Sequence, residues 1–92
     1  MPSANIENAV EGAYWAAFGT AGQRCTSLGN LILHKDIYED FMDRFMAKVK
    51  ETKIGDSLRN EDVLYGSMLS EKYARDFLRD LGMCETDGAT KL

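Results

Sequence analysis

The chain has 92 residues, which suits one domain and excludes a two-domain enzyme, because single domains usually need about 50 to 200 residues. With 45% hydrophobic residues, 28% charged residues and a single proline, it lies in the globular range rather than the disordered or collagen-like ranges. Eleven basic against fifteen acidic residues give a net charge of -4, which repels phosphate backbones and anionic lipid headgroups. We therefore expect no nucleic-acid partner.

The sequence also indicates a compartment. No apolar run approaches the roughly 18 to 20 residues that cross a bilayer, so we expect no membrane partner. Residues 1–5 lack the basic start and apolar core of a secretory signal. Cys25 and Cys84 form no Cys-x-x-Cys pair, and His34 alone cannot complete a zinc set, so no metal site is expected. Lone thiols in an acidic, untargeted chain favour the reducing cytoplasm over a secreted protein with one disulfide.

The first predicted element is a helix from about Asn5 to Phe18, because apolar residues recur there at spacings of three and four. Ser3 or Asn5 can cap its start. Gly19 and Gly22 then make the backbone free to turn sharply, which predicts a tight loop that presents Cys25. The inward face of the helix comprises Ile6, Ala9, Val10, Ala13, Tyr14 and Ala17.

The next predicted element is a strand over residues 28–34, whose centre is the unbroken apolar run at residues 31–33. Such a run is typical of a strand buried on both faces, as in a parallel sheet. A second helix follows, with Asp36 and Glu39 as a capping box and an end near residues 52–55. Its apolar stripe comprises Tyr38, Phe41, Met42, Phe45 and Val49.

The last third of the sequence predicts a long surface loop over residues 56–69, with residues 63–65 held down, and then a third helix. Ser70 caps this helix and Gly82 ends it. Tyr73, Phe77, Leu78 and Leu81 are expected to lie inward. Residues 89–92 are the possible opening of a further strand.

This order of elements predicts an α/β fold class: part of a parallel-sheet domain in the order helix, loop, strand, helix, loop, helix and possible strand, with residues 1–92 as one partial domain. A lone buried strand leaves both edges unpaired, and each buried unpaired group costs about 1 to 3 kcal/mol. We therefore expect the strand edges to pair with the remainder of a larger protein or with a second copy of the chain.

Cys25 is the main candidate for chemistry. Loops between rigid elements are frequent sites of catalysis. A thiol is a useful nucleophile at neutral pH because a few per cent is already thiolate. Flanking glycines let backbone N–H groups approach a developing oxyanion. The alternative is that Cys25 is a small apolar residue with no catalytic role, which is the commoner use of a single cysteine.

The residue sequence around Cys25 resembles that of a known family. The run Phe-Gly-Thr-Ala-Gly-Gln-Arg-Cys-Thr-Ser at residues 18–27 resembles the active-site cysteine segment of the aldehyde dehydrogenase superfamily, F-x-x-x-G-Q-x-C followed by small residues. Residues 9–13 resemble that family's helix before the cysteine. Residues 32–34, 38–41 and 53–56 resemble the strand, helix and turn after it, and residues 85–92 resemble the segment before its next strand. The resemblance covers nearly the whole chain.

The resemblance implies a function. In that family the cysteine thiolate attacks an aldehyde to give a thiohemiacetal, hydride passes to NAD or NADP, and water cleaves the resulting thioester to the carboxylic acid. By resemblance, Cys25 is the nucleophile and its backbone N–H forms half of the oxyanion hole. The family's glutamate base, the amide that completes the oxyanion hole and the cofactor-binding domain have no counterpart in these residues, so the cofactor-binding residues stay unknown. We expect a piece of a catalytic domain that is inactive in isolation.

Two alternatives remain open. One is a non-catalytic interaction or assembly module, which would use the Phe and Met stripe or the strand edge as its contact surface. The other is a small thiol redox protein, which is disfavoured because no resolving cysteine lies near Cys25. Cys84 is interpreted as a spectator thiol and His34 as a partly exposed hydrogen-bonding residue. Acidic residues 39, 40 and 43 are interpreted as a solvated helix face.

Overall fold

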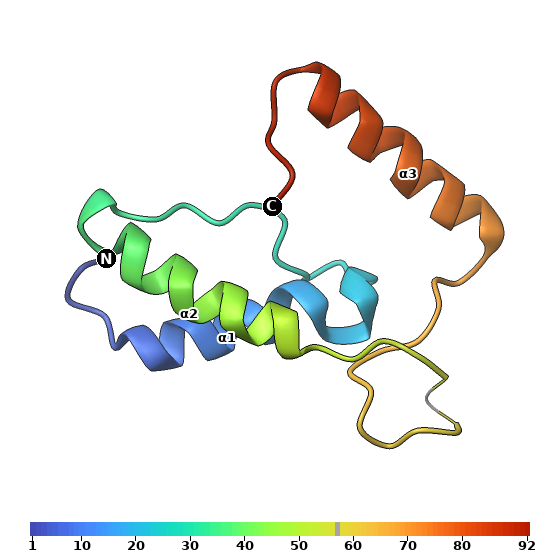
Figure 1. The fold of residues 1–92 in the computed structure, drawn as a ribbon, viewed down its shortest axis with the longest axis horizontal. Coiled ribbons are helices and arrows are strands. Elements are labelled where there is room, and N and C mark those ends of the chain that lie inside the picture. Colours follow the sequence, from blue (N-terminus) through green and yellow to red (C-terminus); the bar gives the residue numbers. More distant parts are fainter. Residues whose placement is uncertain (57) are drawn as a thin grey trace.

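The fold was analysed in a computed structural model that describes residues 1–56 and 58–92. Within these residues the chain forms the helices α1 (Ile6–Phe18), α2 (Tyr38–Glu51) and α3 (Glu71–Thr86) (Figure 1). Two short 3-10 helices, η1 (Gly19–Gly22) and η2 (Lys35–Ile37), follow α1 and precede α2. Ser57, inside the predicted long loop, lies outside the described residues.

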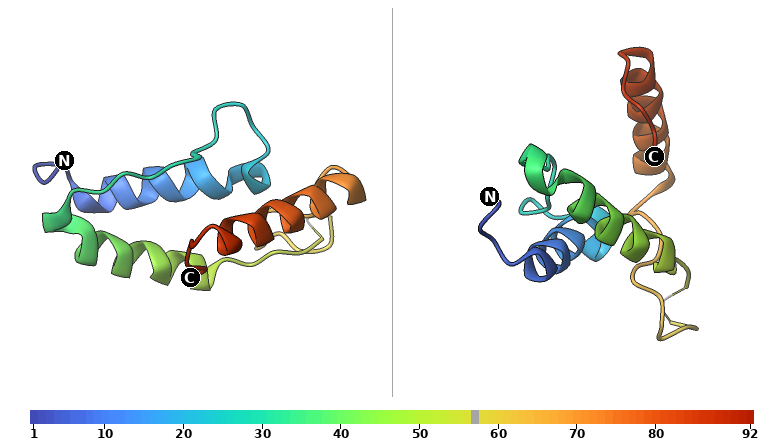
Figure 2. Two further views of the ribbon diagram at one scale, coloured as in Figure 1. Left: turned by 90° about the horizontal axis from the view of Figure 1, so that it is seen from above. Right: turned by 60° about the vertical axis from the view of Figure 1, so that its left-hand side comes forward.

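Helices α1 and α2 lie side by side and form the core (Figures 1 and 2). Val10, Tyr14 and Phe41 are its buried side chains. Stacked and tilted rings extend this core, with centroids 5.6 Å apart for Tyr14 and Phe18 and 6.0 Å apart for Phe18 and Phe45. The predicted apolar faces of the first two helices therefore meet as their 3.6-residue period requires.

The boundaries of α1 agree with the prediction, and those of α2 agree in part. The side chain of Asn5 accepts a hydrogen bond from the Asn8 N–H at 3.2 Å, which caps α1. The predicted capping box at Asp36 and Glu39 is wrong. Instead the Nδ1 atom of His34 accepts from the Asp36 N–H at 3.2 Å and caps η2, which leads into α2.

A hydrogen-bond chain fixes the far end of α2 against α1. The hydroxyl of Thr52 donates to the carbonyl of Lys48 at 3.0 Å, and its oxygen lies 2.5 Å from the hydroxyl of Tyr14. Because the Thr52 proton is used on the carbonyl, Tyr14 is the donor in the second bond. The polar tip of a buried ring is thereby satisfied.

The predicted strand over residues 28–34 does not form, and the α/β fold class is wrong for the described chain. These residues are extended coil, and the one β-type pairing in residues 1–56 and 58–92 is an isolated parallel bridge between Ile54 and Tyr65. Ile32, which should be buried, is 94% exposed. A strand needs a neighbour to satisfy its backbone groups, and within the described residues none lies alongside. Residues 89–92 are likewise coil rather than a strand.

The loop that links α2 to α3 is folded back on itself, as the sequence predicts for residues 63–65. The N–H of Leu64 donates to the carbonyl of Lys53 at 2.8 Å, and the N–H of Gly55 donates to the carbonyl of Tyr65 at 3.2 Å. The ammonium of Lys53 lies 2.6 Å from a carboxylate oxygen of Asp62. These contacts close the loop at its base.

Helix α3 differs from its prediction in length and in burial. It runs through Gly82 to Thr86, and the left-handed residue that follows it is Gly88, at φ 99°. In the described part of the chain α3 packs against neither α1 nor α2, and it stands away from them (Figure 2). Its expected inward residues Tyr73, Phe77 and Leu78 are exposed, because there is no second layer for them to cover.

The three helices of the described chain are arranged less compactly than in a typical domain of this length. The radius of gyration is 14.8 Å, against about 12 Å for a compact domain of this length. The accessible surface of 7417 Å² exceeds by roughly 2,000 Å² the area expected for a compact monomer of this mass. No helix among the described residues is both long enough and apolar enough to span a bilayer.

A charge cluster on the solvent side joins the two core helices. The ammonium of Lys48 lies 2.5 Å from one oxygen of Glu11, whose other oxygen accepts from the indole N–H of Trp15 at 2.9 Å. The same ammonium lies 5.1 Å from the centroid of the Tyr14 ring. The hydrogen bond from Lys48 holds the pKa of Glu11 below its usual range, and Glu11 raises the pKa of Lys48 in return.

We predict that Glu11→Gln flattens the acid limb of the stability curve. Because the pKa of Glu11 is lower in the folded state, its contribution is present above the unfolded pKa and disappears as the pH falls through the folded one. The contribution of Lys48 is lost only as the pH rises through its raised pKa. Both groups are exposed, so the effect is small and weakens with salt.

Urea unfolding at several acidic and neutral pH values measures this effect. Glu61→Gln, which removes an exposed carboxylate from the loop after α2, is the matched control. Glu11→Gln should lose stability at neutral pH and converge on the wild type in acid. Parallel curves for the wild type and Glu11→Gln would contradict the interpretation.

Candidate active site

The loop that presents Cys25 begins with three consecutive residues in the left-handed region. Thr20 and Ala21 both have φ 57°, and Gly22 has φ 71°. We call residues 20–22 the left-handed turn. A left-handed backbone is ordinary for glycine but costs about 1–2 kcal/mol for a residue with a β carbon. Gly22 is also sterically required, since a β carbon there would lie 3.1 Å from the carbonyl oxygen of Ala17.

Side chains from the next two residues hold the left-handed turn. The Nε atom of Arg24 donates to the hydroxyl of Thr20 at 3.0 Å. The backbone N–H of Gln23 donates to the carbonyl of Thr20 at 3.1 Å, and its side-chain amide donates to the same carbonyl at 3.3 Å. Local strain of this kind persists only where neighbouring contacts over-determine it. Here those contacts come from residues directly before Cys25.

Cys25 itself lies in a hydrogen-bonded turn over residues 24–27, which we call the cysteine turn. The N–H of Ser27 donates to the carbonyl of Arg24 at 3.1 Å, and the hydroxyl of Ser27 accepts from the N–H of Arg24 at 3.2 Å. The N–H of Leu28 then donates to the carbonyl of Ala16 at 2.9 Å, which fastens the exit of the turn to the last turn of α1. The turn is therefore anchored at both ends.

The thiol and the amide of Cys25 are both available. Cys25 is exposed and carries a free thiol. The N–H groups of Gln23, Arg24, Ser27 and Leu28 all have acceptors. Among the described residues, the N–H of Cys25 has none. An exposed thiol beside a free backbone N–H is a pair of groups that an oxyanion-stabilised addition could use.

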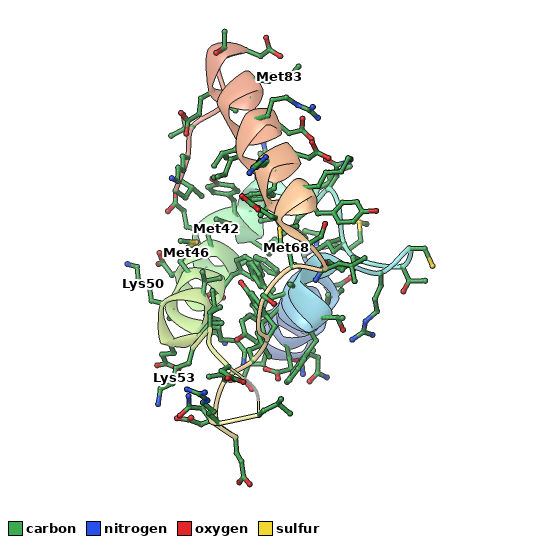
Figure 3. All side chains as sticks on the ribbon, turned by 90° about the vertical axis from the view of Figure 1, so that its right-hand side faces the viewer. Met42, Met46, Lys50, Lys53, Met68 and Met83 are labelled. Atoms are coloured by element: carbon green, nitrogen blue, oxygen red, sulfur yellow. The ribbon has the colours of Figure 1, made fainter. Side chains whose placement is uncertain are left out.

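An apolar groove lies beside the left-handed turn. It has a volume of about 510 Å³, and Ala17, Phe18, Ala21, Gly22, Gln23, Tyr65, Met68 and Phe77 line it. Figure 3 shows Met68 beneath the start of α3. A second groove of about 460 Å³ lies on the far loop and is lined by residues 54–56, 58 and 66–67. Neither groove includes Cys25. Of the two, only the first adjoins the left-handed turn, because Ala21 and Gly22 line it.

These two grooves do not fit a dinucleotide. A pyrophosphate needs cationic side chains or a converging set of backbone N–H groups. The first groove is lined by apolar residues and one amide, and the second carries the carboxylate of Asp56. Neither offers a positive charge, so we assign no cofactor-binding residue in these two grooves.

Among the described residues, the other candidate residues make no hydrogen bond or ion pair with the cysteine turn. His34 caps η2, and its ring nitrogen lies 3.6 Å from a carboxylate oxygen of Asp36. Cys84 is an exposed free thiol on α3. Asp40 pairs with Arg44 on the solvent side of α2 at 2.8 Å. In residues 1–56 and 58–92 no three metal-ligating side chains come together.

Sequence reasoning missed two contacts of this site. It used Gln23 only as part of the cysteine segment. It did not predict that the side-chain oxygen of Gln23 accepts a hydrogen bond from the N–H of Leu69 at 2.9 Å. It also did not identify the hydroxyl of Ser27 as a partner of the turn. Ser side chains often bond to backbone groups a few residues away, so Ser27 could have indicated the second contact. No sequence signal indicates the first, because it spans 46 positions.

We predict that Ala21→Gly raises the free energy of unfolding by about 1 kcal/mol, because it removes the β carbon from a left-handed residue. Ala47→Gly is the control. Ala47 lies inside α2, where glycine should instead destabilise by about 0.5–1 kcal/mol. Urea unfolding followed by far-ultraviolet circular dichroism measures both. Equal destabilisation by the two variants would show that the left-handed turn is absent in solution.

Comparison with known proteins identifies the family. All 92 residues match the model of the aldehyde dehydrogenase family. The chain is 32% identical over 92 residues to aldehyde dehydrogenase family 7 member A1 of Brassica napus, covering 100% of this chain and 18% of that protein. It is 33% identical over 92 residues to malonate-semialdehyde dehydrogenase of Bacillus cereus (strain B4264), covering 100% and 19%. It is 30% identical over 88 residues to putative aldehyde dehydrogenase AldY of Bacillus subtilis (strain 168), covering 96% and 18%.

The chain therefore spans just under a fifth of the length of these curated relatives. The agreement extends over the helices, the left-handed turn and the cysteine turn alike, since the family match includes every residue. The chain belongs to the aldehyde dehydrogenase family.

Proposed function

We propose that residues 1–92 form part of the catalytic domain of an NAD(P)-dependent aldehyde dehydrogenase, in which Cys25 is the nucleophile that attacks the aldehyde. The observation that supports this most directly is the exposed thiol of Cys25 in an anchored turn, with its own N–H free. Membership of the family supports the reaction class, the oxidation of an aldehyde to a carboxylic acid. The substrate is therefore a small molecule with an accessible carbonyl carbon.

The step assigned to this chain is an addition. The thiolate of Cys25 forms a carbon–sulfur bond to the carbonyl carbon, and the π electrons of the C=O bond move to the oxygen. The product is a thiohemiacetal oxyanion, which takes up a proton from solvent if it is not otherwise consumed. A backbone N–H close to that oxygen stabilises it without needing to reorganise, which is how oxyanion holes lower such barriers. In this proposal the N–H of Cys25 is that donor.

The same proposal expects almost no turnover by the 92-residue chain alone. A positioned general base contributes typically 10²–10⁴-fold, and holding the reactants in a reactive geometry contributes more still. The described chain places no carboxylate or imidazole against Cys25 among its hydrogen bonds and ion pairs, and the two grooves described above do not suit a dinucleotide. The hydride acceptor of the proposed reaction is NAD(P), and in our proposal protein outside these residues binds it.

We expect a short aldehyde such as propanal to protect Cys25, but not Cys84, from iodoacetamide. Reversible addition occupies the Cys25 sulfur, and Cys84 provides an internal control because it is an exposed thiol on a helix without a comparable turn. Mass spectrometry of the two cysteine peptides measures both rates in one sample. Propanal that slows both thiols equally would contradict a special role for Cys25.

Turnover is the second arm of this test. NAD(P)H formation by the purified chain should stay at the background level with Cys25 intact. Clear turnover that disappears in Cys25→Ser would overturn the expectation of inactivity while supporting the nucleophile. Clear turnover that persists in Cys25→Ser would overturn the assignment of Cys25.

A second candidate function, a non-catalytic assembly module, is favoured by one observation. The strand edges that were expected to mediate assembly are not formed in the described residues, but α3 presents Tyr73, Phe77 and Leu78 to solvent on a helix that packs on no other. Contiguous exposed apolar surface on a small protein marks an interaction site. A second copy of the chain or the remainder of a longer protein would then cover it.

We expect Phe77→Ser to shift any oligomer of the 92-residue chain toward the monomer in gel filtration, while Cys25→Ser leaves the elution volume unchanged. Phe77 is 56% exposed, so its replacement removes apolar surface without opening a core. Arg75→Ser, which removes an exposed ion pair with Glu71 from the same helix, is the control for changes in helix stability. Wild-type protein that is monomeric throughout the micromolar range would exclude self-assembly.

We also propose a cytoplasmic location. Both cysteines are free in the structure. Thiols remain reduced in the cytoplasm and tend to oxidise in secreted proteins.

A further inference from the structure

We propose that Gln23 is a positioning residue, whose side-chain amide clamps the left-handed turn before Cys25 to the segment that leads into α3 and so aims the N–H of Cys25. This inference rests on the proposed role of Cys25 and deepens it. Within the part of the chain that the structure describes, the side chain of Gln23 makes no hydrogen bond to the sulfur or the N–H of Cys25. It acts through the backbone that links Gln23 to Cys25.

The evidence begins with two hydrogen bonds from one amide group. The Oε1 atom of Gln23 accepts from the N–H of Leu69 at 2.9 Å. The Nε2 atom donates to the carbonyl of Thr20 at 3.3 Å. A glutamine is suited to this use because its amide is a donor and an acceptor at the same time. The side chain of Gln23, two residues before Cys25, therefore joins the left-handed turn to Leu69, which lies 46 positions further along the chain.

The place of Leu69 gives this contact its consequence. Leu69 directly precedes Ser70, the residue before the first turn of α3. Within the described residues α3 packs on neither core helix, so its position relative to the cysteine turn depends on few contacts. The clamp is one of them, and the apolar groove that Met68 and Phe77 line together with Phe18 and Ala21 is another. Gln23 also lines that groove.

The effect on Cys25 follows from the anchoring of the turn. The exit of the cysteine turn is fixed by the bond from Leu28 to Ala16. Its entrance is fixed through Thr20, which accepts hydrogen bonds from the side chains of Gln23 and Arg24. If the Gln23 amide is removed, the entrance loses its link to Leu69, and the plane of the peptide that carries the Cys25 N–H is held less tightly. An N–H that must first be oriented stabilises an oxyanion less than one already in place.

This mechanism predicts a split between two reactions of the same sulfur. Alkylation by iodoacetamide forms no oxyanion, so it does not need the Cys25 N–H. Addition to propanal forms one and does. Loss of the clamp should therefore weaken the aldehyde adduct and leave alkylation almost unchanged, whereas general unfolding of the loop would alter both.

The test compares the 92-residue wild type with Gln23→Met, which keeps the length and approximate volume of the side chain but removes the amide. The propanal concentration that half-protects Cys25 should rise roughly 2- to 10-fold, the range for one lost hydrogen bond. The alkylation rate of Cys25 relative to Cys84, without aldehyde, should change less than about twofold. Asn30→Ala, which removes another exposed amide from the same loop, is the matched control and should change neither quantity.

Amide exchange at Leu69, measured by NMR, tests the clamp without reference to the aldehyde. Exchange should be roughly 2- to 10-fold faster in Gln23→Met than in the wild type. In Gln23→Glu it should stay slow, because a carboxylate oxygen can still accept from the Leu69 N–H. Unchanged exchange in Gln23→Met would overturn the clamp, whatever the thiol does.

The outcomes separate this inference from the proposed function. A wild type whose Cys25 is not protected by propanal would refute the nucleophile and, with it, the positioning role, while the exchange at Leu69 would still report whether the clamp exists. Protection that is equally strong in Gln23→Met would overturn the positioning role and leave Cys25 as the nucleophile. Parallel loss of protection and of alkylation would show a purely structural role and also overturn the inference.

Discussion

A reversal of chain direction directly after α1 determines where Cys25 lies. Three successive left-handed residues, of which two carry a β carbon, turn the chain back, and the bond from Leu28 to Ala16 fastens the returning segment to the helix it has just left. Without this reversal the cysteine would follow α1 outward on an unanchored segment. The strain is local, and it is held by side chains of Gln23 and Arg24 that belong to the same segment. Cys25 is thus presented by a constrained backbone rather than by a pocket wall.

The helical part of the fold was accessible from the sequence because its information is local. Apolar residues at spacings of three and four defined the faces of α1 and α2, and these faces do meet at Tyr14 and Phe41. The strand over residues 28–34 was mispredicted for the opposite reason. Its apolar run has the composition of a buried strand, but a strand exists only with a partner, and the described chain supplies none alongside it. The end of α3 was mispredicted because a single glycine at position 82 costs too little to stop a helix.

The candidate site likewise has features that the sequence predicted and features that it did not. Two glycines and a small-residue context were enough to locate a tight loop that presents Cys25, and the structure has that loop. The left-handed conformation of Thr20 was not predictable, because a β-branched residue disfavours it and only the surrounding contacts impose it. The contact between Gln23 and Leu69 was not predictable either, since it depends on how a long loop returns.

The open shape is consistent with the length of the curated relatives. A surface roughly 2,000 Å² larger than that of a compact monomer is comparable with the area buried in a stable protein–protein interface. The chain spans just under a fifth of those relatives, and several of its exposed large apolar residues lie on α3. In the proposed enzyme, other protein covers this surface and completes the site around Cys25.

The central claim, that the sulfur of Cys25 bonds to an aldehyde carbon, is tested most directly by NMR with propanal labelled with ¹³C at the carbonyl. The account predicts a resonance of a tetrahedral carbon bonded to sulfur, which correlates with the β protons of Cys25 and is absent in Cys25→Ser. The same resonance in Cys25→Ser, or its correlation with Cys84 alone, would contradict the account.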